Sequence, residues 1–300
     1  MDLESFGIDV QEEAGYIKCS ADKIIGTDIN LDFPSVGATE NIMLASVFAE
    51  GETILTNAAL EPEIVDLQKM LNKMGAKIEG AGTNIIKIKG VKKLKEASHN
   101  IMPDRIEAGT MLVATAMTAG KVEVTNANIN DIVPIIHKLE EMGCKIGTKG
   151  DIINLMAPKK LKAVDIKTMP YPGFPTDMQS VFGAAFTIAK GTSLIIENIF
   201  ENRYKYITEL KRMGAKATIE GKTAIIKGTK KLTGAEVNAT DLRGGAALVL
   251  AGLTAKGTTK VNNIEYILRG YENLGGKLNR LGAKVEEVGE ISEEKRKKSG

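Results

Sequence analysis

The chain has 300 residues, of which 43% are hydrophobic, enough apolar material for about two domains with buried cores. Its 40 basic and 38 acidic residues leave a net charge of +2, and only 4% of the residues are aromatic. Because a nucleic-acid-binding protein would show a basic surface, we expect no nucleic-acid partner. The sequence contains no signal segment and no apolar span of membrane length, which predicts a soluble, cytoplasmic protein without a membrane partner.

A repeat organises the chain, and each copy is marked by a glycine between a helix of small residues and a β-rich run. The intervals between successive marker glycines are 69, 71 and 66 residues, a regularity that chance does not produce. The β-rich runs that follow the marker glycines are Gly51–Asn57, Gly120–Asn126, Gly191–Asn198 and Gly257–Asn263.

Each repeat reads as a helix, a strand, a second helix and two or three short strands. The first helix is apolar nearly all round and must be buried, whereas the second has a charged face. The second helix ends in a shared signature whose glycine stops the helix before the next strand. These signatures are Met74–Lys77, Met142–Lys145, Met213–Lys216 and Leu281–Lys284. The buried helices are expected near residues 37–49, 106–118, 178–189 and 243–255.

The two ends of the chain depart from the repeat. Glu4-Ser-Phe-Gly-Ile-Asp9 matches the end of a repeat rather than its start, so we expect the chain to open about two-thirds of the way through a unit. Residues 291–300 are charged and polar, which predicts a disordered tail.

The segment Met169–Gln179 leads into one of the buried helices. Its prolines at positions 170, 172 and 175 predict an extended backbone that ends where the helix begins. Asp177 would then lie in the first turn of that helix, where backbone N–H groups stabilise negative charge. A simple helix cap is the alternative interpretation of this aspartate.

Packing of the repeats around an approximate axis would bring the N-termini of the buried helices together and create an anion site. A non-catalytic scaffold is equally compatible with a repeat.

Metal clusters and Cys–His catalysis are poorly supported, because Cys19 and Cys144 form no CxxC pair and His99 and His137 are the only histidines. Cys144 occupies a position where other repeats have alanine, which favours packing over chemistry.

Seven motifs give the chain a resemblance to a known family. They are Phe33–Thr39, Glu61–Asp66, Pro103–Glu107, Phe174–Gln179, Ile199–Arg203, Ala239–Arg243 and Arg269–Glu272. In this register the chain resembles the UDP-N-acetylglucosamine 1-carboxyvinyltransferase family of enolpyruvyl transferases. The resemblance implies an α/β (α+β) fold, an inside-out α/β barrel of repeated βαβαββ-like units with the apolar helices inside. Two domains are expected, an incomplete amino-terminal one over residues 1–101 and a carboxy-terminal one over residues 102–290.

The reaction implied by this resemblance moves the enolpyruvyl group of phosphoenolpyruvate onto the 3-hydroxyl of UDP-N-acetylglucosamine, the first committed step of peptidoglycan synthesis. It needs no metal and no organic cofactor. In family terms Asp177 takes the hydroxyl proton, and Arg269 binds phosphoenolpyruvate. The residues implied to line the nucleotide-sugar site are Phe33, Pro34, Ser35, Val36 and Ile199. Those implied to surround the reacting centre are Arg203, Asp241 and Arg243. Leu268 replaces an acidic residue expected just before Arg269.

Parts of the family pattern have no counterpart in this sequence: an early Lys-Asn pair and a loop with a proton-donating cysteine. The chain alone is therefore expected to be inactive. Two alternatives remain open: a nucleotide-sugar binding or regulatory protein without turnover, and a partner that is completed by a separate amino-terminal fragment.

Overall fold

A computed structural model describes residues 4–288, so the predicted tail at 291–300 lies outside the described residues. Contacts divide the chain into two compact units. Unit 1 comprises the chain up to Asp104 together with Met169–Pro175, and unit 2 comprises Arg105–Thr168 and the chain from Thr176 onward. Because the loop Met169–Pro175 groups with unit 1, the domain limits 1–101 and 102–290 are kept as a proposal.

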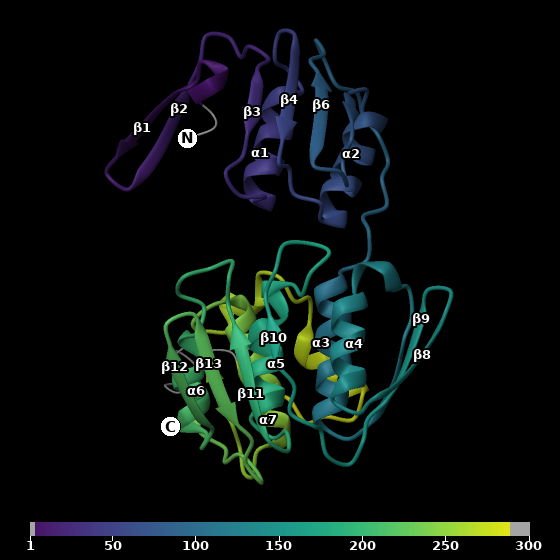
Figure 1. Cartoon of the computed structure of the whole chain (residues 1–300), viewed down its shortest axis with the longest axis vertical. Coiled ribbons are helices and arrows are strands. Elements are labelled where there is room, and N and C mark those ends of the chain that lie inside the picture. Colours follow the sequence, from purple (N-terminus) through teal and green to yellow (C-terminus); the bar gives the residue numbers. More distant parts are fainter. Residues whose placement is uncertain (1–3, 289–300) are drawn as a thin grey trace, which may run out of the picture. The chain divides into compact units, whose positions relative to one another are not determined.

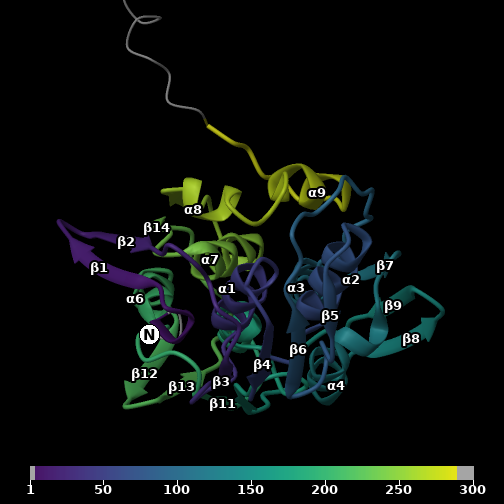
Figure 2. The ribbon, with the colours of Figure 1, turned by 90° about the horizontal axis from the view of Figure 1, so that it is seen from above.

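From residue 4 onward, unit 1 holds one four-stranded sheet, in the order β3-β4-β6-β5, two α-helices and one short 3-10 helix. β3 is parallel to β4, and the other neighbours are antiparallel. An exposed hairpin, β1–β2, stands apart from this sheet (Figures 1 and 2). The elements of unit 1 are η1 (Glu4–Phe6), β1 (Asp9–Glu13), β2 (Tyr16–Ser20), β3 (Asp28–Asn30), α1 (Val36–Ser46), β4 (Glu52–Thr56), α2 (Pro62–Lys73), β5 (Lys77–Glu79) and β6 (Ile85–Lys89).

Unit 2 contains further copies of the same helix and strand arrangement. Its first part comprises α3 (Arg105–Met117), β7 (Lys121–Val124), η2 (Ile129–Asp131), α4 (Val133–Glu141), β8 (Lys145–Lys149) and β9 (Ile152–Met156). Its middle part comprises β10 (Ile166–Lys167), η3 (Thr176–Met178), α5 (Gln179–Phe186), β11 (Thr192–Ile196), α6 (Lys205–Arg212), β12 (Lys216–Glu220) and β13 (Thr223–Lys227). Its last part comprises β14 (Glu236–Asn238), α7 (Leu242–Thr254), β15 (Lys260–Asn262), α8 (Glu265–Leu268) and α9 (Leu274–Arg280).

The apolar helices of unit 2 lie inside and its sheets lie outside. Helices α3, α5 and α7 contact one another, and all eight residues of α5 are buried. The sheets β10-β11-β13-β12 and β7-β9-β8 cover different sides of these helices, as Figure 1 shows. The sheets stay separate and none closes on itself within residues 4–288. The predicted α/β fold is confirmed. Helices α3, α5 and α7 are largely buried as predicted, whereas only four of the eleven residues of α1 are buried, because α1 has no second helix of its kind beside it among the described residues of unit 1.

The four apolar helices start within one residue of the predicted positions, but α1 and α5 each end three residues earlier than predicted. Gly75, Gly143, Gly214 and Gly282 follow the second helix of each repeat with φ between +89° and +103°, as a glycine stop requires. α5 begins at Gln179 because the preceding residues form a 3-10 turn. None of the described helices is both long enough and apolar enough to cross a bilayer.

Candidate active site

The loop that precedes Asp177 is a tight turn, so the extended backbone predicted from its prolines is wrong. The N–H of Met169 donates to the carbonyl oxygen of Phe174 at 3.0 Å, and that of Gly173 donates to the carbonyl oxygen of Pro170 at 2.8 Å. Proline fixes φ near −65°, which suits a turn as well as an extended segment, and glycine lets the chain reverse.

Asp177 lies in the 3-10 turn η3 and does not cap α5. Its Oδ1 accepts a hydrogen bond from Nη2 of Arg203 at 2.6 Å, and its Oδ2 accepts one from Nη2 of Arg243 at 2.9 Å. The N-cap residue of α5 is Met178, which makes no side-chain capping bond. The helix-cap interpretation is therefore wrong, because two guanidinium groups take the place of helix N–H groups.

This ion triad is only partly open to solvent. The side chain of Asp177 is 36% exposed, while those of Arg203 and Arg243 are 16% and 14% exposed. Desolvation alone would raise the pKa of Asp177, but the charges of Arg243 and Arg203 and their hydrogen bonds outweigh it and hold that pKa below its ordinary value. The carboxylate is thus ionised at neutral pH, and two cations facing one anion leave a net positive charge.

Arg243 has donor capacity that the triad does not use. Its Nη1 is buried and has no hydrogen-bond partner among residues 4–288. Its guanidinium lies over the ring of Tyr271, 5.4 Å from the centroid, and the Tyr271 hydroxyl pairs with Thr110 Oγ1 at 2.9 Å. Arg243 stands in the first turn of α7, where Oδ1 of Asp241 accepts from the backbone N–H groups of Arg243 and Gly244 at 3.0 and 2.8 Å. Asp241 therefore acts in this structure as the cap of α7.

Glu197 lies behind the ion triad and supports it through hydrogen bonds. It is 1% exposed, and its Oε1 accepts from Thr168 Oγ1 and from the backbone N–H groups of Ile199 and Phe200 at 2.8 to 3.1 Å. Its Oε2 accepts from Thr176 Oγ1 at 2.9 Å, and Thr176 Oγ1 in turn accepts from Arg203 Nη1 at 3.0 Å. Glu197 is thereby linked to Asp177 through hydrogen bonds that fix the position of Arg203.

The remaining predicted residues of unit 2 lie around this centre or on its surface. Ile199 is half-buried in the turn that Glu197 holds, and the next residue, Phe200, lies under the guanidinium of Arg203 at 4.7 Å. Arg269 is exposed at the C-terminal end of α8, after the half-exposed Leu268. Of the predicted residues in unit 2, the structure brings Asp177, Arg203 and Arg243 into direct ion pairs.

The predicted nucleotide-sugar residues of unit 1 surround the start of α1. Ser35 is its N-cap and accepts from the backbone N–H of Ala38 at 3.3 Å. Phe33 is 44% exposed, and Pro34 and Val36 are half-buried. Ligand binding by these residues stays a prediction.

Sequence reasoning missed Glu197, Thr176 and Tyr271. For Glu197 a signal exists in the β-rich runs. Three runs place an asparagine six residues after the marker glycine, whereas the third run has Glu197 there and its asparagine, Asn198, one residue later. A buried carboxylate at an inserted position is typical of a polar network.

Residues 1–278 match the family described as EPSP synthase (3-phosphoshikimate 1-carboxyvinyltransferase). The chain belongs to this family of enolpyruvyl transferases. It is 57% identical over 283 residues to UDP-N-acetylglucosamine 1-carboxyvinyltransferase 1 of Caldanaerobacter subterraneus subsp. tengcongensis, covering 94% of this chain and 68% of that protein. It is 54% identical to UDP-N-acetylglucosamine 1-carboxyvinyltransferase 2 of Clostridium tetani, with the same coverage.

Solved structures of enolpyruvyl transferases share the fold. The enolpyruvyl transferase NikO from Streptomyces tendae matches with a TM-score of 0.83 and 26% identity, over 94% of this chain and 70% of that one. EPSP synthase from Acinetobacter baumannii matches with a TM-score of 0.71 and 22% identity over 94% of this chain and 69% of that one, which shows the fold alone. The chain therefore spans about two-thirds of the length of these enolpyruvyl transferases.

Proposed function

We propose that the chain takes part in enolpyruvyl transfer from phosphoenolpyruvate to the 3-hydroxyl of UDP-N-acetylglucosamine, a step of peptidoglycan synthesis. The observation that carries this proposal is the triad in which Asp177 is held between Arg203 and Arg243. Relatives that are 54–57% identical and named for this activity support the choice of substrates. Asp177 is the proposed general base, and the two arginines bind the anionic donor.

In this reaction the sugar hydroxyl oxygen attacks the central carbon of phosphoenolpyruvate while Asp177 accepts the hydroxyl proton. A separate acid protonates the methylene carbon. The tetrahedral adduct then loses inorganic phosphate and a proton from the new methyl group, which regenerates the carbon–carbon double bond and forms the enol ether of the product. Each proton transfer requires a positioned acid or base, and such a group usually accelerates the reaction by about 10²–10⁴.

The donor carries a phosphate and a carboxylate, and planar guanidinium groups bind such anions through paired N–H donors. Arg243 offers a buried Nη1 without a partner in the described part of the chain. We propose that the donor takes this position, with Arg269 as a further cation. Asp241 contributes by capping α7, which fixes the backbone that presents Arg243.

The triad also suggests how Asp177 becomes a useful base. A carboxylate whose pKa is depressed by two arginines is ionised but only weakly basic. When the donor phosphate takes up guanidinium donors, less positive charge acts on Asp177 and its pKa rises. Donor binding would therefore activate the base for the incoming hydroxyl.

The alternative is nucleotide-sugar binding without turnover. It is favoured by the state of the cysteines: Cys144 is 5% exposed, and burial raises the pKa of its thiol to about 11. Cys19 lies on the exposed strand β2. A buried thiol of that pKa does not suit the role of a proton donor, so a chain without another acid would bind the donor and fail to release phosphate.

Calorimetric titration of the chain with phosphoenolpyruvate, followed by a phosphate-release assay with UDP-N-acetylglucosamine, separates these functions. Binding that is weakened about tenfold or more by Arg243→Lys, which removes the guanidinium fork, supports the donor site. The matched control is Arg212→Lys, because Arg212 is 55% exposed on α6. Donor binding that is unchanged by Arg243→Lys would contradict the proposal.

Asp177→Asn tests the base in any preparation that turns over. We expect donor binding to survive and phosphate release to fall by about 10²–10⁴. Unchanged turnover would reduce Asp177 to a structural partner of the arginines.

A further inference from the structure

One end of unit 2 gathers exposed lysines from all three of its repeats. At this end the buried helices α3, α5 and α7 finish, and the marker glycines lead into the strands that follow. The lysines lie at strand ends and in the connections between strands rather than in the helices. We call this set the lysine patch, and it comprises the exposed residues Lys121, Lys145, Lys159, Lys160, Lys162, Lys190, Lys216, Lys227, Lys230, Lys231 and Lys256.

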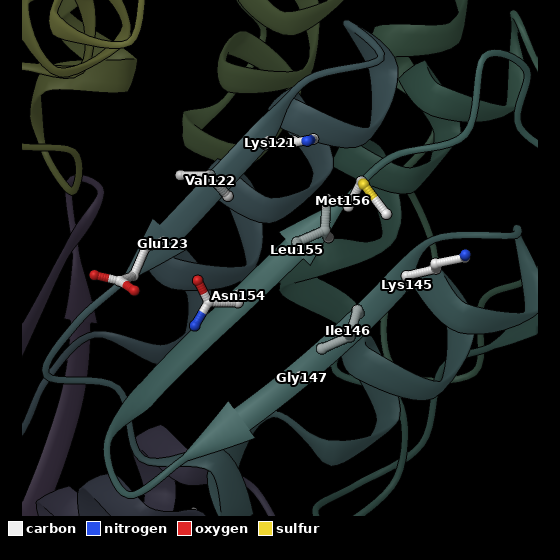
Figure 3. A pocket seen from close by; sticks show the side chains of 9 residues that line it. All are labelled: Lys121, Val122, Glu123, Lys145, Ile146, Gly147, Asn154, Leu155 and Met156. Atoms are coloured by element: carbon white, nitrogen blue, oxygen red, sulfur yellow. The ribbon is translucent and has the colours of Figure 1, made fainter.

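Strand pairing sets the patch in rows across the sheets. Lys121 of β7 and Lys145 of β8 both face Met156 of β9, so two lysines flank a methionine on the exposed side of that sheet (Figure 3). In the next sheet Lys216 of β12 lies directly opposite Lys227 of β13. Both rows lie at the marker-glycine end of their sheets.

The positive charge of the patch is not neutralised. Lys216 and Lys227 place like charges directly opposite each other, and the bridge partners Lys162 and Lys190 do so again. Opposed like charges destabilise a sheet, so a bound anion would relieve their repulsion. Within residues 4–288 no lysine of the patch forms an ion pair, and the lysines of unit 2 that do so are Lys138, Lys260 and Lys277.

Helix dipoles do not account for these lysines. The negative partial charge at a helix C-terminus favours cations mainly within the last turn. The last turns of α3, α5 and α7 contain no basic residue. Stabilisation of the buried helices is therefore no reason for the patch.

Acidic residues lie at the opposite ends of the same strands. Exposed carboxylates are carried by Asp151 in the turn between β8 and β9, Glu220 at the end of β12 and Glu201 after β11. On the side of the patch, Glu140 and Glu141 end α4, and Glu141 is already in an ion pair. The net charge of +2 thus hides a separation of charge along unit 2.

A hollow of about 500 Å³ lies on the exposed side of the sheet β7-β9-β8, beside the row of Lys121, Met156 and Lys145. Gly147 contributes to its lining (Figure 3). A Cβ on this glycine would meet no atom within 4 Å and its φ is not left-handed, so neither packing nor backbone conformation requires glycine. The corresponding residue of β12 is Thr218. Glycine inside a strand often marks the close approach of a ligand, so the hollow offers room for an anionic group beside two ammonium groups.

The composition of the patch distinguishes among anionic partners. Protein interfaces and single-stranded nucleic-acid sites are anchored by aromatic residues and arginine, and the patch contains neither. The exposed aromatic residues among 105–288, Phe200 and Tyr266, lie outside it. Anionic phospholipids, by contrast, are attracted by clustered lysines near a membrane surface. Met156, which is 38% exposed between two lysines, adds an apolar contact.

We propose that the lysine patch binds the surface of a membrane that contains anionic phospholipids. The ammonium groups attract the lipid phosphates, and one head group enters the hollow beside Lys121 and Lys145. This binding is separate from enolpyruvyl transfer, because the patch includes none of the triad residues Asp177, Arg203 and Arg243.

Co-sedimentation of the chain with vesicles made of equal parts of phosphatidylglycerol and phosphatidylcholine tests the proposal. We expect binding to these vesicles and at least about tenfold weaker binding to pure phosphatidylcholine. Raising the salt from about 0.05 M to about 0.5 M should also weaken binding at least about tenfold, since salt screens exposed charges. Equal binding to both kinds of vesicle, or no binding to the anionic ones at the lower salt, would overturn the proposal.

Two pairs of charge reversals locate the surface. Lys159→Glu/Lys160→Glu should weaken binding to the anionic vesicles at least about tenfold, because each lysine near the lipid adds to the attraction. The matched control Lys149→Glu/Lys222→Glu reverses exposed lysines at the opposite ends of the same hairpins, about one strand length away and beyond the screening length. It alters the net charge equally and should change binding by less than about twofold. Equal weakening by the two variants would refute the patch as the binding surface.

Gly147→Thr tests the hollow at unchanged charge. Because it gives β8 the residue found in β12, the strand should tolerate the change, and vesicle binding should fall about fivefold as one head-group contact is lost. Unchanged binding would overturn the assignment of a head group to the hollow.

A single-stranded oligonucleotide decides between a lipid surface and polyanions in general. Added to the anionic vesicles at an equal phosphate concentration, it should leave most of the chain bound to lipid, because the patch has no aromatic residue on which bases stack. Complete displacement of the chain from the vesicles would overturn the choice of a membrane as the partner.

Discussion

Helices α1 and α5 are both rich in apolar and small residues, but their surroundings differ. In α5 every residue is buried, and Phe182 and Phe186 meet edge to face with their ring centroids 6.0 Å apart. In α1 only four of eleven residues are buried, and Leu44 is 49% exposed. The helices of unit 2 have each other as neighbours, whereas α1 is the sole helix of its kind in unit 1 within the described residues. An apolar helix is therefore buried only as far as its neighbours allow.

The largest expected change in stability comes from truncating a buried side chain of α5. Phe182→Ala should lower the free energy of unfolding of unit 2 by about 3–5 kcal/mol, because a fully buried ring is replaced by a cavity. Hydrogen exchange of α5 and α7 amides measures this loss. Phe48→Ala, which truncates a side chain that is 53% exposed, is the control and should cost well under about 1 kcal/mol. Similar losses for both variants would contradict the comparison.

The next effect concerns the polar network beside α5. Glu197→Ala removes the acceptor of two threonine hydroxyls and two backbone N–H groups, and we expect a loss of about 1–3 kcal/mol in the stability of unit 2. Chemical denaturation provides the measurement. Glu201→Gln, an exposed change four residues further along the same segment, should be neutral.

A smaller effect should appear only in acid. The pKa of Asp177 is lower in the folded chain than its ordinary value of 3.8, so the stability it contributes is present above that value and is lost as the pH falls through the folded value. Asp177→Asn should therefore flatten the decline of unfolding free energy with falling pH. Denaturation at pH values from about 6 down to 3 tests this. Asp151→Asn, in the exposed turn between β8 and β9, should retain the wild-type slope.

The smallest expected effect on stability comes from the exposed side of α1. Leu44→Gln replaces an exposed apolar side chain, so the free energy of unfolding should change by less than about 0.5 kcal/mol. Self-association should decrease, because exposed apolar surface promotes contact between copies. Sedimentation velocity over a range of concentrations measures this decrease. Glu40→Gln, a polar exchange on the same helix, is the control, and an equal change for both variants would contradict the role of apolar surface.

Much of the fold was predictable because it is repetitive. The marker glycines, the helix-stop signatures and the apolar helices each occur four times. Because each helix or strand prediction recurs at a regular spacing, the copies support one another. The loop before Asp177 was mispredicted because proline allows both extended and turn conformations. The position of Glu197 was detectable as an inserted residue, but its partners were not, since Thr168 and Thr176 lie in a different part of the chain.

By itself the sequence determined the repeat, the four apolar helices and the candidate residues Asp177, Arg203 and Arg243. Only the tertiary structure decided that these three form one ion triad, because a carboxylate can be stabilised equally by helix N–H groups or by distant cations. It also decided the strand pairing: within residues 4–288, β4, β11 and β15 each have a parallel neighbour and β7 has none. Strand pairing is a contact between segments, so a sequence pattern that predicts a strand does not show whether that strand has found its partner.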